Sequence, residues 1–178
     1  NYLSEFPKEI VLWVQNQKGL KNLYEIVSKS HTEYLSSLGD PTGSNRPTVP
    51  WSLIEKYREG IIVGSGGHRG RLFDYSINKP DYVIEKEMER YDVIQIEPTE
   101  VAKHLAVNEN PEVDRYEYLD ESWKRIVDLA KKHNKFIIAT DGAHYTDKED
   151  HLIHNILIYS QLPPKRPHHI RKGKMEYP

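Results

Sequence analysis

The stretch that decides the fold is residues 136–145, Phe-Ile-Ile-Ala-Thr-Asp-Gly-Ala-His-Tyr. Its opening apolar and small residues are typical of a buried, central strand of a parallel sheet, and Asp141 and His144 come directly after that strand. Open and closed α/β sheets keep their sites at the carboxyl ends of the strands. The two residues are therefore interpreted either as metal or proton-transfer groups, or as an Asp that caps the next turn beside a locally hydrogen-bonded His.

Further apolar runs with the composition of strands lie at residues 9–15, 61–63 and 92–97. Each strand is followed by a segment with helical periodicity. This alternation predicts parallel strands joined by right-handed crossovers, and so an α/β fold. We expect the turn at residues 64–68, Glu97 and residues 141–144 to lie together at one end of the sheet.

The helix after the first strand is predicted from one apolar stripe. Its members are Leu20, Leu23, Tyr24, Val27, His31, Tyr34, Leu35 and Leu38. His31 is either a satisfied core residue or a ligand. Residues 39–49 are rich in Gly, Pro, Asn and Asp and predict a surface loop. Ser52 and Glu55 have capping-box spacing, which predicts a short helix closed by Gly60.

Later helices are predicted at residues 71–78, 81–90 and 120–133. The last of these carries apolar residues on one face, namely Trp123, Ile126, Val127 and Ala130. After the fourth strand, a further helix is marked by Leu152, Ile153, Ile156 and Leu157.

Composition predicts one soluble globular domain: 178 residues, 37% apolar, 29% charged, with a net charge of -2. The chain has no cysteine, which excludes disulfides, thiolate nucleophiles and zinc-thiolate sites and favours a cytoplasmic protein. No apolar run reaches membrane-spanning length, and the polar first residues are not a signal peptide. A start without Met indicates a piece of something longer.

The second strand runs into Gly-Ser-Gly-Gly-His-Arg-Gly at residues 64–70. Such a turn can present backbone N–H groups to a phosphate, and Arg69 and Arg71 add positive charge. It lacks the Lys-Ser/Thr ending of a P-loop and the spacing of a dinucleotide site. We predict anion binding by this turn through Ser65, Gly66, Gly67 and Arg69. The alternative is that the glycines only let the backbone turn tightly.

The C-terminal stretch is basic on an otherwise balanced chain. Its cations Lys165, Arg166, Arg171 and Lys172 predict contact with nucleic-acid phosphates. The alternative is that residues 163–178 are a tail or linker to a next domain, after a folded segment at residues 1–162.

Several stretches resemble the PHP (polymerase and histidinol phosphatase) domain of PolC-type DNA polymerase III, in order and with matching spacing over residues 6–161. The first is Phe-Pro-Lys-Glu-Ile-Val-Leu-Trp-Val-Gln-Asn-Gln-Lys-Gly-Leu-Lys-Asn-Leu-Tyr at residues 6–24, followed by Ser-His at 30–31. The others are Leu-Ile-Glu-Lys-Tyr-Arg-Glu-Gly-Ile-Ile-Val-Gly-Ser at 53–65, Ala-Thr at 139–140, His-Tyr at 144–145 and Ile-Leu-Ile-Tyr-Ser-Gln at 156–161.

The resemblance implies part of a distorted parallel (β/α) barrel of the PHP type, with a metal cluster of His, Asp, Glu and Cys ligands at the carboxyl ends. It also implies that an exonuclease domain is inserted upstream, so that this chain is the later part of a split domain. An early His-x-His motif would then lie before Asn1. His31 matches the helix-end His of the family, and His144 matches the His of its Asp-x-His or Asn-x-His motif.

The departures from the family pattern concern the same cluster. Gly67 stands where many relatives have a Cys ligand, and Arg71 where an acidic residue often follows. The Asp141-Gly142 order displaces a carboxylate by one residue, and His68 is left to compensate. We take His31, His68, Asp141 and His144 as candidate ligands for zinc, manganese or magnesium and assign no catalytic residue. Together the departures favour a degenerate metal site.

Three functions follow from these observations. The one we favour is a noncatalytic PHP segment of a bacterial replicative PolC-type DNA polymerase III, a DNA-directed nucleotidyltransferase, with the polymerase chemistry elsewhere in the parent. Its partners would be other domains of the same chain, and DNA through the parent, with no membrane. The alternatives are a metal-dependent phosphoesterase and a nucleic-acid-contacting module that acts through the basic tail.

Overall fold

A computed structural model of the chain describes residues 7–36, 45–105 and 115–161. The chain divides into two compact units, residues 1–140 and 141–178. The first unit contains, in order, β1 (Val11–Val14), α1 (Gln17–Thr32), β2 (Leu35–Ser36), β3 (Arg46–Pro47), α2 (Trp51–Lys56), β4 (Ile61–Gly64), the 3₁₀ turn η2 (Gly67–Arg69), α3 (Arg71–Asn78), α4 (Asp81–Met88), β5 (Val93–Ile96), η3 (Thr99–Leu105), α5 (Arg115–Lys132) and β6 (Phe136–Ala139). The second contains η4 (Lys148–Asp150) and α6 (His151–Gln161).

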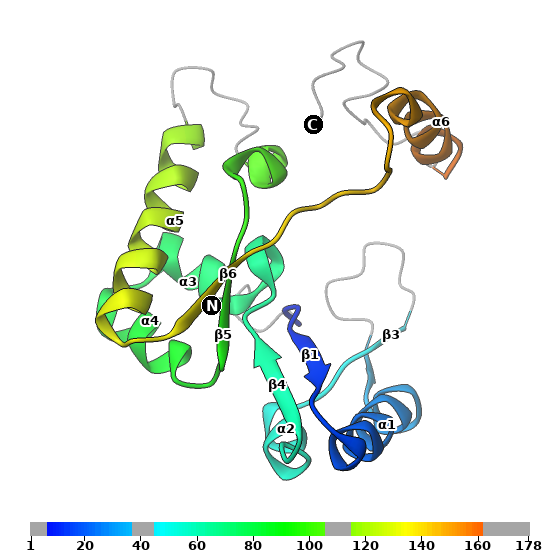
Figure 1. The fold of residues 1–178 in the computed structure, drawn as a ribbon, viewed down its shortest axis with the longest axis vertical. Helices are drawn as coiled ribbons and strands as arrows, with labels where there is room; N and C mark the ends of the chain where they lie inside the picture. The colour runs from blue at the N-terminus through cyan, green and yellow to red at the C-terminus, as the bar shows by residue number, and fades with distance from the viewer. Residues whose placement is uncertain (1–6, 37–44, 106–114, 162–178) are drawn as a thin grey trace. The chain divides into compact units, whose positions relative to one another are not determined.

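The main sheet has the strand order β1-β4-β5-β6 (Figure 1). The last three strands are parallel, as predicted, with Gly64 beside Val93 and Val93 beside Phe136. The first strand is not: β1 pairs antiparallel with β4, with Val11 opposite Gly64. The expectation of four parallel strands is therefore wrong, and the fold is a mixed α/β sheet that does not close into a barrel within the described residues.

The route between β1 and β4 explains this reversal. After β1 the chain runs out through α1, turns through the β2-β3 pair, and returns through α2 to Gly60. There the Gln15 N–H donates to the Gly60 carbonyl at 2.9 Å, so β4 begins beside the end of β1. When the connection between two strands brings the chain back to the end of the first strand, the second strand runs antiparallel to the first. An apolar run in the sequence carries no information about this direction.

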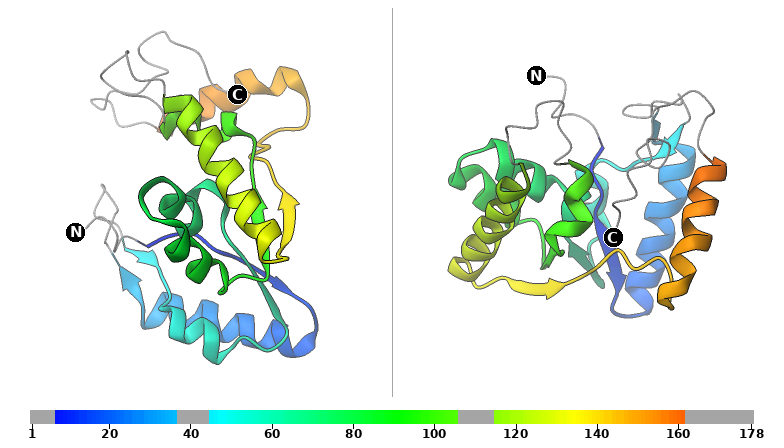
Figure 2. Two further views of the ribbon diagram at one scale, coloured as in Figure 1. Left: turned by 90° about the vertical axis from the view of Figure 1, so that its left-hand side faces the viewer. Right: turned by 90° about the horizontal axis from the view of Figure 1, so that it is seen from above.

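Much of the core lies between the sheet and a group of three helices, α3, α4 and α5, which gather on one side of the strands (Figures 1 and 2). Ile26 of α1 and Ile54 of α2 belong to the same apolar cluster. Val63 and Ile94 of the central strands are fully buried there. The helix predicted at residues 71–78 is α3, and its Phe73 packs on Trp123 of α5 with ring centroids 4.4 Å apart. The apolar face predicted for residues 120–133 is confirmed, because Trp123, Ile126 and Ala130 are buried.

The apolar stripe predicted for the first helix is wrong in most of its members, although Leu23 packs against the core. Tyr24 and Val27 of α1 are 63% and 45% exposed, and His31 is also exposed. The buried face consists instead of small, polar and apolar residues, namely Gly19, Asn22, Ile26 and Ser30.

Close packing on the α2–β4 turn determines which face of α1 is buried. A Cβ atom at position 19 would lie 1.8 Å from the Gly60 carbonyl oxygen, so only glycine permits this approach. The Asn22 side-chain amide donates to the Glu59 carbonyl at 2.8 Å, which satisfies that buried polar group. Close backbone contact and a hydrogen bond, in place of packing between apolar side chains, therefore hold α1 against the α2–β4 turn.

The short helix predicted near Ser52 is present as α2, but its capping box is not. The N-cap is Pro50, and no side chain caps the helix. Trp51 is thus already helical, and Ser52 lies inside the first turn. The helix ends at Lys56, and Gly60 adopts φ 74° in the turn that leads into β4.

The fourth strand lies at an edge of the described sheet, not at its centre as predicted. It pairs with β5 on one side, and Phe136 is 66% exposed. The helix predicted after it is present in the second unit as α6. The apolar residues that mark α6, Leu152, Ile153, Ile156 and Leu157, are each more than half exposed. No helix among the described residues is long and apolar enough to cross a membrane.

Candidate site at the carboxyl ends of β4 and β5

The candidate site is the turn that follows β4, which lies beside the end of the neighbouring parallel strand β5. Past Gly64 the chain enters Ser65 and Gly66, and Gly66 and Gly67 both have positive φ, 79° and 58°. The Ser65 N–H donates to the Val93 carbonyl at 3.1 Å, and the Gln95 N–H donates to the Ser65 hydroxyl oxygen at 2.9 Å. These two hydrogen bonds join the turn to β5.

Two side chains from the β5 segment reach across to the backbone of this turn. Gln95 Oε1 accepts from the Gly66 N–H at 3.0 Å, and Glu97 Oε2 accepts from the His68 N–H at 2.8 Å. Residues 95 and 97 are two apart, so in an extended strand their side chains lie on the same face. The positive-φ backbone places the N–H groups of Gly66 and His68 opposite that face, where side-chain oxygen atoms accept from both.

His68 and Glu97 form a second, stronger contact. The His68 Nδ1 atom lies 2.6 Å from Glu97 Oε2, and the two side chains are only 8% and 14% exposed. Burial alone would raise the pKa of the Glu97 carboxyl, but hydrogen bonds from the His68 ring and N–H, with the charges of His68 and Arg69, hold that pKa below its usual value. An ionised carboxylate can only accept, so His68 Nδ1 carries the proton between them.

Glycine at position 67 is favoured by its φ of 58° and also leaves room for this contact. A Cβ atom there would lie 2.5 Å from the Glu97 carboxyl carbon. The Glu97 carboxylate therefore occupies the space into which a side chain at position 67 would project. In this chain the position at which the family pattern places a Cys ligand is taken up by a carboxylate from the neighbouring strand.

The predicted anion-binding residues are brought together by this turn, but their donors already have partners. The N–H groups of Ser65, Gly66 and His68 bind oxygen atoms of β5 and of Glu97. The Arg69 guanidinium lies 3.3 Å from the Glu9 carboxylate, and both side chains are more than 60% exposed. Anion binding stays a prediction, and the oxygen atoms bound at this turn belong to the protein.

Each of the predicted metal ligands contacts another group of the protein. His31 lies near the end of α1, exposed, with Nδ1 2.9 Å from the Val27 carbonyl oxygen, whereas His68 is paired with Glu97. In the second unit, the Ala143 N–H donates to Asp141 Oδ1 at 3.2 Å, and the His144 ring stacks on His154 with centroids 4.9 Å apart. Across the residues that the structure describes, no group of three or more His, Asp or Glu side chains is arranged to hold a metal ion.

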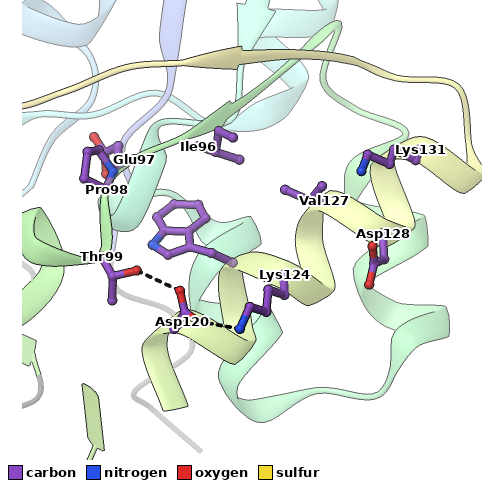
Figure 3. A pocket seen from close by; sticks show the side chains of 10 residues that line it. Ile96, Glu97, Pro98, Thr99, Asp120, Lys124, Val127, Asp128 and Lys131 are labelled. Atoms are coloured by element: carbon purple, nitrogen blue, oxygen red, sulfur yellow. Dashed lines mark hydrogen bonds and ion pairs between the residues drawn. The ribbon is translucent and has the colours of Figure 1, made fainter. Parts of the chain in front are cut away.

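An open cleft of about 510 Å³, which the sequence did not predict, lies where the end of β5 faces α5 (Figure 3). It is lined by Ile96, Glu97, Pro98, Thr99, Asp120, Trp123, Lys124, Val127, Asp128 and Lys131. The Thr99 hydroxyl donates to Asp120 at 3.3 Å, and Lys124 pairs with Asp120 at 2.6 Å. The hydrogen bond from Lys124 lowers the pKa of the Asp120 carboxyl. Two of the opposite charges on this rim, Asp120 and Lys124, are thus paired with each other.

The predicted nucleic-acid contacts lie outside the described residues. They are Lys165, Arg166, Arg171 and Lys172, and the predicted boundary after residue 162 lies there too.

The fold and this turn define an α/β domain with its polar residues at the carboxyl ends of parallel strands. Comparison with known proteins then gives the family: the chain matches the PHP domain over residues 2–142. The chain belongs to the PHP domain family, as the sequence predicted.

Its relatives include long DNA polymerases. The chain is 37% identical over 161 residues to "DNA polymerase III PolC-type" of Halalkalibacterium halodurans, an alignment that covers 90% of this chain and 10% of that protein. It is 37% identical over 155 residues to the protein of the same name in Staphylococcus epidermidis, covering 87% and 10%. For Bacillus subtilis the identity is 36% over 160 residues, covering 90% and 10%. The chain thus spans about a tenth of the length of these relatives.

Proposed function

We propose that this chain is a structural PHP domain segment of a replicative PolC-type DNA polymerase III and that it carries a degenerate metal site. The observation that carries the proposal is the identity of 36–37% to polymerases of that type over about nine tenths of the chain. Polymerase chemistry would then belong to the other nine tenths of the parent. The partners would be other domains of the same chain and, through the parent, DNA in the cytoplasm of a bacterium.

The proposed architecture is the later part of a distorted barrel that other segments of the parent complete. Among the described residues β6 has a strand partner on one side alone, and Phe136 is 66% exposed; both support this, because a strand edge of this kind is a template for pairing with another strand. In such a barrel the antiparallel β1 would be one source of the distortion.

A degenerate rather than an active metal site is supported by the contacts of the four candidate ligands. A divalent metal site needs several ligands at fixed distances around one point. His68 is instead paired with Glu97, and Asp141 with the Ala143 N–H. The described residues therefore do not fit a two- or three-metal phosphoesterase centre, and we derive no metal-dependent step.

The noncatalytic role is tested on the 178-residue chain purified without chelator. We expect less than one equivalent of zinc or manganese by elemental analysis. We also expect no hydrolysis of p-nitrophenyl phosphate above the buffer rate when zinc, manganese or magnesium is added. Two equivalents of metal, or turnover that His144→Ala abolishes, would establish the phosphoesterase instead.

The split-barrel architecture is tested by light scattering and thermal melts of the chain, with and without the preceding part of the parent's PHP domain. We expect self-association of the isolated chain, reduced by Phe136→Lys, and a higher melting temperature with the added part. Tyr82→Lys, a matched exposed aromatic on α4, should leave the association unchanged. A monomer whose melting temperature is unchanged by the added part would contradict the proposal.

A further inference from the structure

We propose that Asp141 is a site of spontaneous covalent modification, at which the aspartate converts through a cyclic succinimide to isoaspartate as the chain ages. Asp141 and Gly142 stand in the reverse of the order that the family pattern has here, and this reversal places a glycine directly after the aspartate. The reaction takes place within the chain and needs no enzyme, metal or cofactor. It does not depend on the function of the parent protein.

The reaction is an attack by a backbone nitrogen on the side chain that precedes it. The Gly142 nitrogen forms a bond to Asp141 Cγ, and one carboxyl oxygen leaves as water with the protons of the carboxyl group and of the Gly142 N–H. Water then adds to the succinimide ring. When it adds at the main-chain carbonyl of Asp141, the bond from that carbon to the Gly142 nitrogen breaks, the chain continues through Cβ and Cγ, and isoaspartate results. Addition at Cγ restores aspartate.

The attacking nitrogen is accessible in this structure. Residues 141–145 belong to no helix or strand, and Asp141, Gly142 and Ala143 are all exposed. The sheet still holds the residue before them, because the Thr140 N–H donates to the Ile96 carbonyl at 2.8 Å. Within the described part of the chain, the Gly142 N–H has no hydrogen-bond acceptor. Glycine has no Cβ atom to hinder the nitrogen, and its backbone can adopt the conformation that ring closure requires.

The Asp141 carboxyl group already lies over the segment with which it would react. Its Oδ1 atom accepts from the Ala143 N–H at 3.2 Å. This contact spans Gly142, so the side chain is turned toward the residues that follow it. Ring closure then needs rotation about bonds of Asp141 and Gly142, in a segment whose backbone is not part of a helix or a strand.

Asp147 provides a comparison within the same unit. It is exposed as well, but the residue after it is Lys148, which carries a side chain and begins η4. The Asp147 carbonyl accepts from the Asp150 N–H at 3.0 Å. The side chain of Lys148 and this hydrogen-bonded turn both oppose ring closure. The structure therefore assigns the modification to Asp141 and not to Asp147.

The modification changes the main chain at a defined place. Asp141 is the first residue of the second compact unit. Isoaspartate adds the Cβ atom to the main chain there and leaves the carboxylate on the α-carbon. The main chain between β6 and His144, the residue that matches a ligand of the family, is thereby lengthened in the aged protein.

The test ages the 178-residue chain at neutral pH in water enriched in oxygen-18. Peptides that contain Asp141 or Asp147 are then separated by chromatography and analysed by mass spectrometry. Isomerisation alone leaves the mass unchanged, but each opening of the ring by water introduces one oxygen-18 atom. We expect label and isoaspartate to accumulate together at Asp141, at a rate close to that in a synthetic peptide of residues 135–148, whereas Asp147 stays unlabelled.

Two variants control for the mechanism. Asp141→Glu keeps the carboxylate but would have to close a larger ring, so we expect no modification at this position. Gly142→Val keeps the aspartate but hinders the attacking nitrogen, and the rate should fall severalfold. Because both positions are exposed, both variants should melt at the temperature of the wild type.

The proposal is overturned if the aged wild type shows no more label at Asp141 than at Asp147. It is also overturned if the synthetic peptide converts while the folded chain does not, because the fold would then protect the site. Label that accumulates in Gly142→Val at the wild-type rate would overturn it as well, since the reaction would not pass through the nitrogen of residue 142.

Discussion

Two regions of this chain place a carboxylate and an imidazole after an apolar strand, yet only one of them forms a buried site. At the ends of β4 and β5, His68 and Glu97 come from different strand ends, 29 residues apart, and contact each other at 2.6 Å with little exposure. After β6, Asp141 binds an N–H two residues away, and the exposed His144 stacks on His154.

The difference shows that residue type and strand-end position are not enough to make a site. His68 and Glu97 meet because β4 and β5 are neighbouring parallel strands whose ends lie side by side. Asp141 and His144 are close in sequence, and they contact an N–H and a ring of the same unit, at Ala143 and His154. A buried hydrogen-bonded pair depends on the surrounding core to hold it, and the first region has that core.

The largest effect should come from the core that supports the first region. Ile94 of β5 is fully buried, next in sequence to Gln95. Ile94→Ala removes buried methyl groups and leaves a cavity, so we expect it to lower the free energy of unfolding by about 2–5 kcal/mol. Urea unfolding followed by circular dichroism measures this loss.

The matched control is Ile153→Ala on α6, an isoleucine that is 58% exposed. Its effect should stay within about 0.5 kcal/mol, because a largely exposed side chain loses little packing. Equal losses in the free energy of unfolding for Ile94→Ala and Ile153→Ala would mean that α6 is as well packed as the sheet. The two regions would then not differ in packing.

A smaller effect should come from the hydrogen-bonded pair of His68 and Glu97 itself. Glu97→Gln keeps the size of the side chain but weakens two hydrogen bonds, from the His68 N–H and ring. We expect a loss of about 1–3 kcal/mol at pH 7. Asp141→Asn, the corresponding change after β6, should cost less than about 0.5 kcal/mol.

The pH dependence of this loss has a definite sign. The pKa of Glu97 is lowered in the folded chain from its ordinary value of 4.5. A group with a lowered folded-state pKa stabilises fully above its unfolded pKa, and loses that contribution as the pH falls through the folded pKa. The gap between the wild type and Glu97→Gln in urea melts should therefore be constant near neutral pH and shrink below pH 4.5. A gap that widens on acidification would contradict the assigned pair.

Sequence patterns predicted the positions of helices and strands better than they predicted strand direction and helix packing. Short apolar runs identified all the strands of the main sheet, and α3 has the predicted bounds. The direction of β1 was missed because it depends on the hydrogen bond between Gln15 and Gly60, far apart in sequence. The buried face of α1 was missed because Gly19 is buried by backbone approach, which hydrophobic periodicity does not register.

The candidate site was predicted in pieces. His68 and the glycine turn were singled out as candidate binding groups, whereas Glu97 was expected only to lie at the same end of the sheet. The signal that would have found it is the spacing of Gln95 and Glu97, polar residues on one face of an otherwise apolar strand. The contact of Glu97 with His68 could not be predicted from their spacing in the sequence, because the pairing of β4 with β5 sets the distance between these two residues.

The smallest expected effect is the coupling between the two rings after β6, and it tests the comparison most directly. His144 and His154 stack with an angle of 13° between their planes, and Tyr145 lies 5.7 Å from His154. A double-mutant cycle with alanine at both positions isolates the energy of the pair. Because His144 is exposed, we expect a coupling of about 0.5 kcal/mol or less, at or below the bottom of the range for aromatic pairs. The same cycle on His68 and Glu97 should give more than about 1 kcal/mol, since that pair is buried and charge-assisted. A ring pair that couples as strongly as the buried pair would show that the region after β6 is held by its own packing, and the distinction between a buried and a locally bonded strand end would no longer explain the two regions.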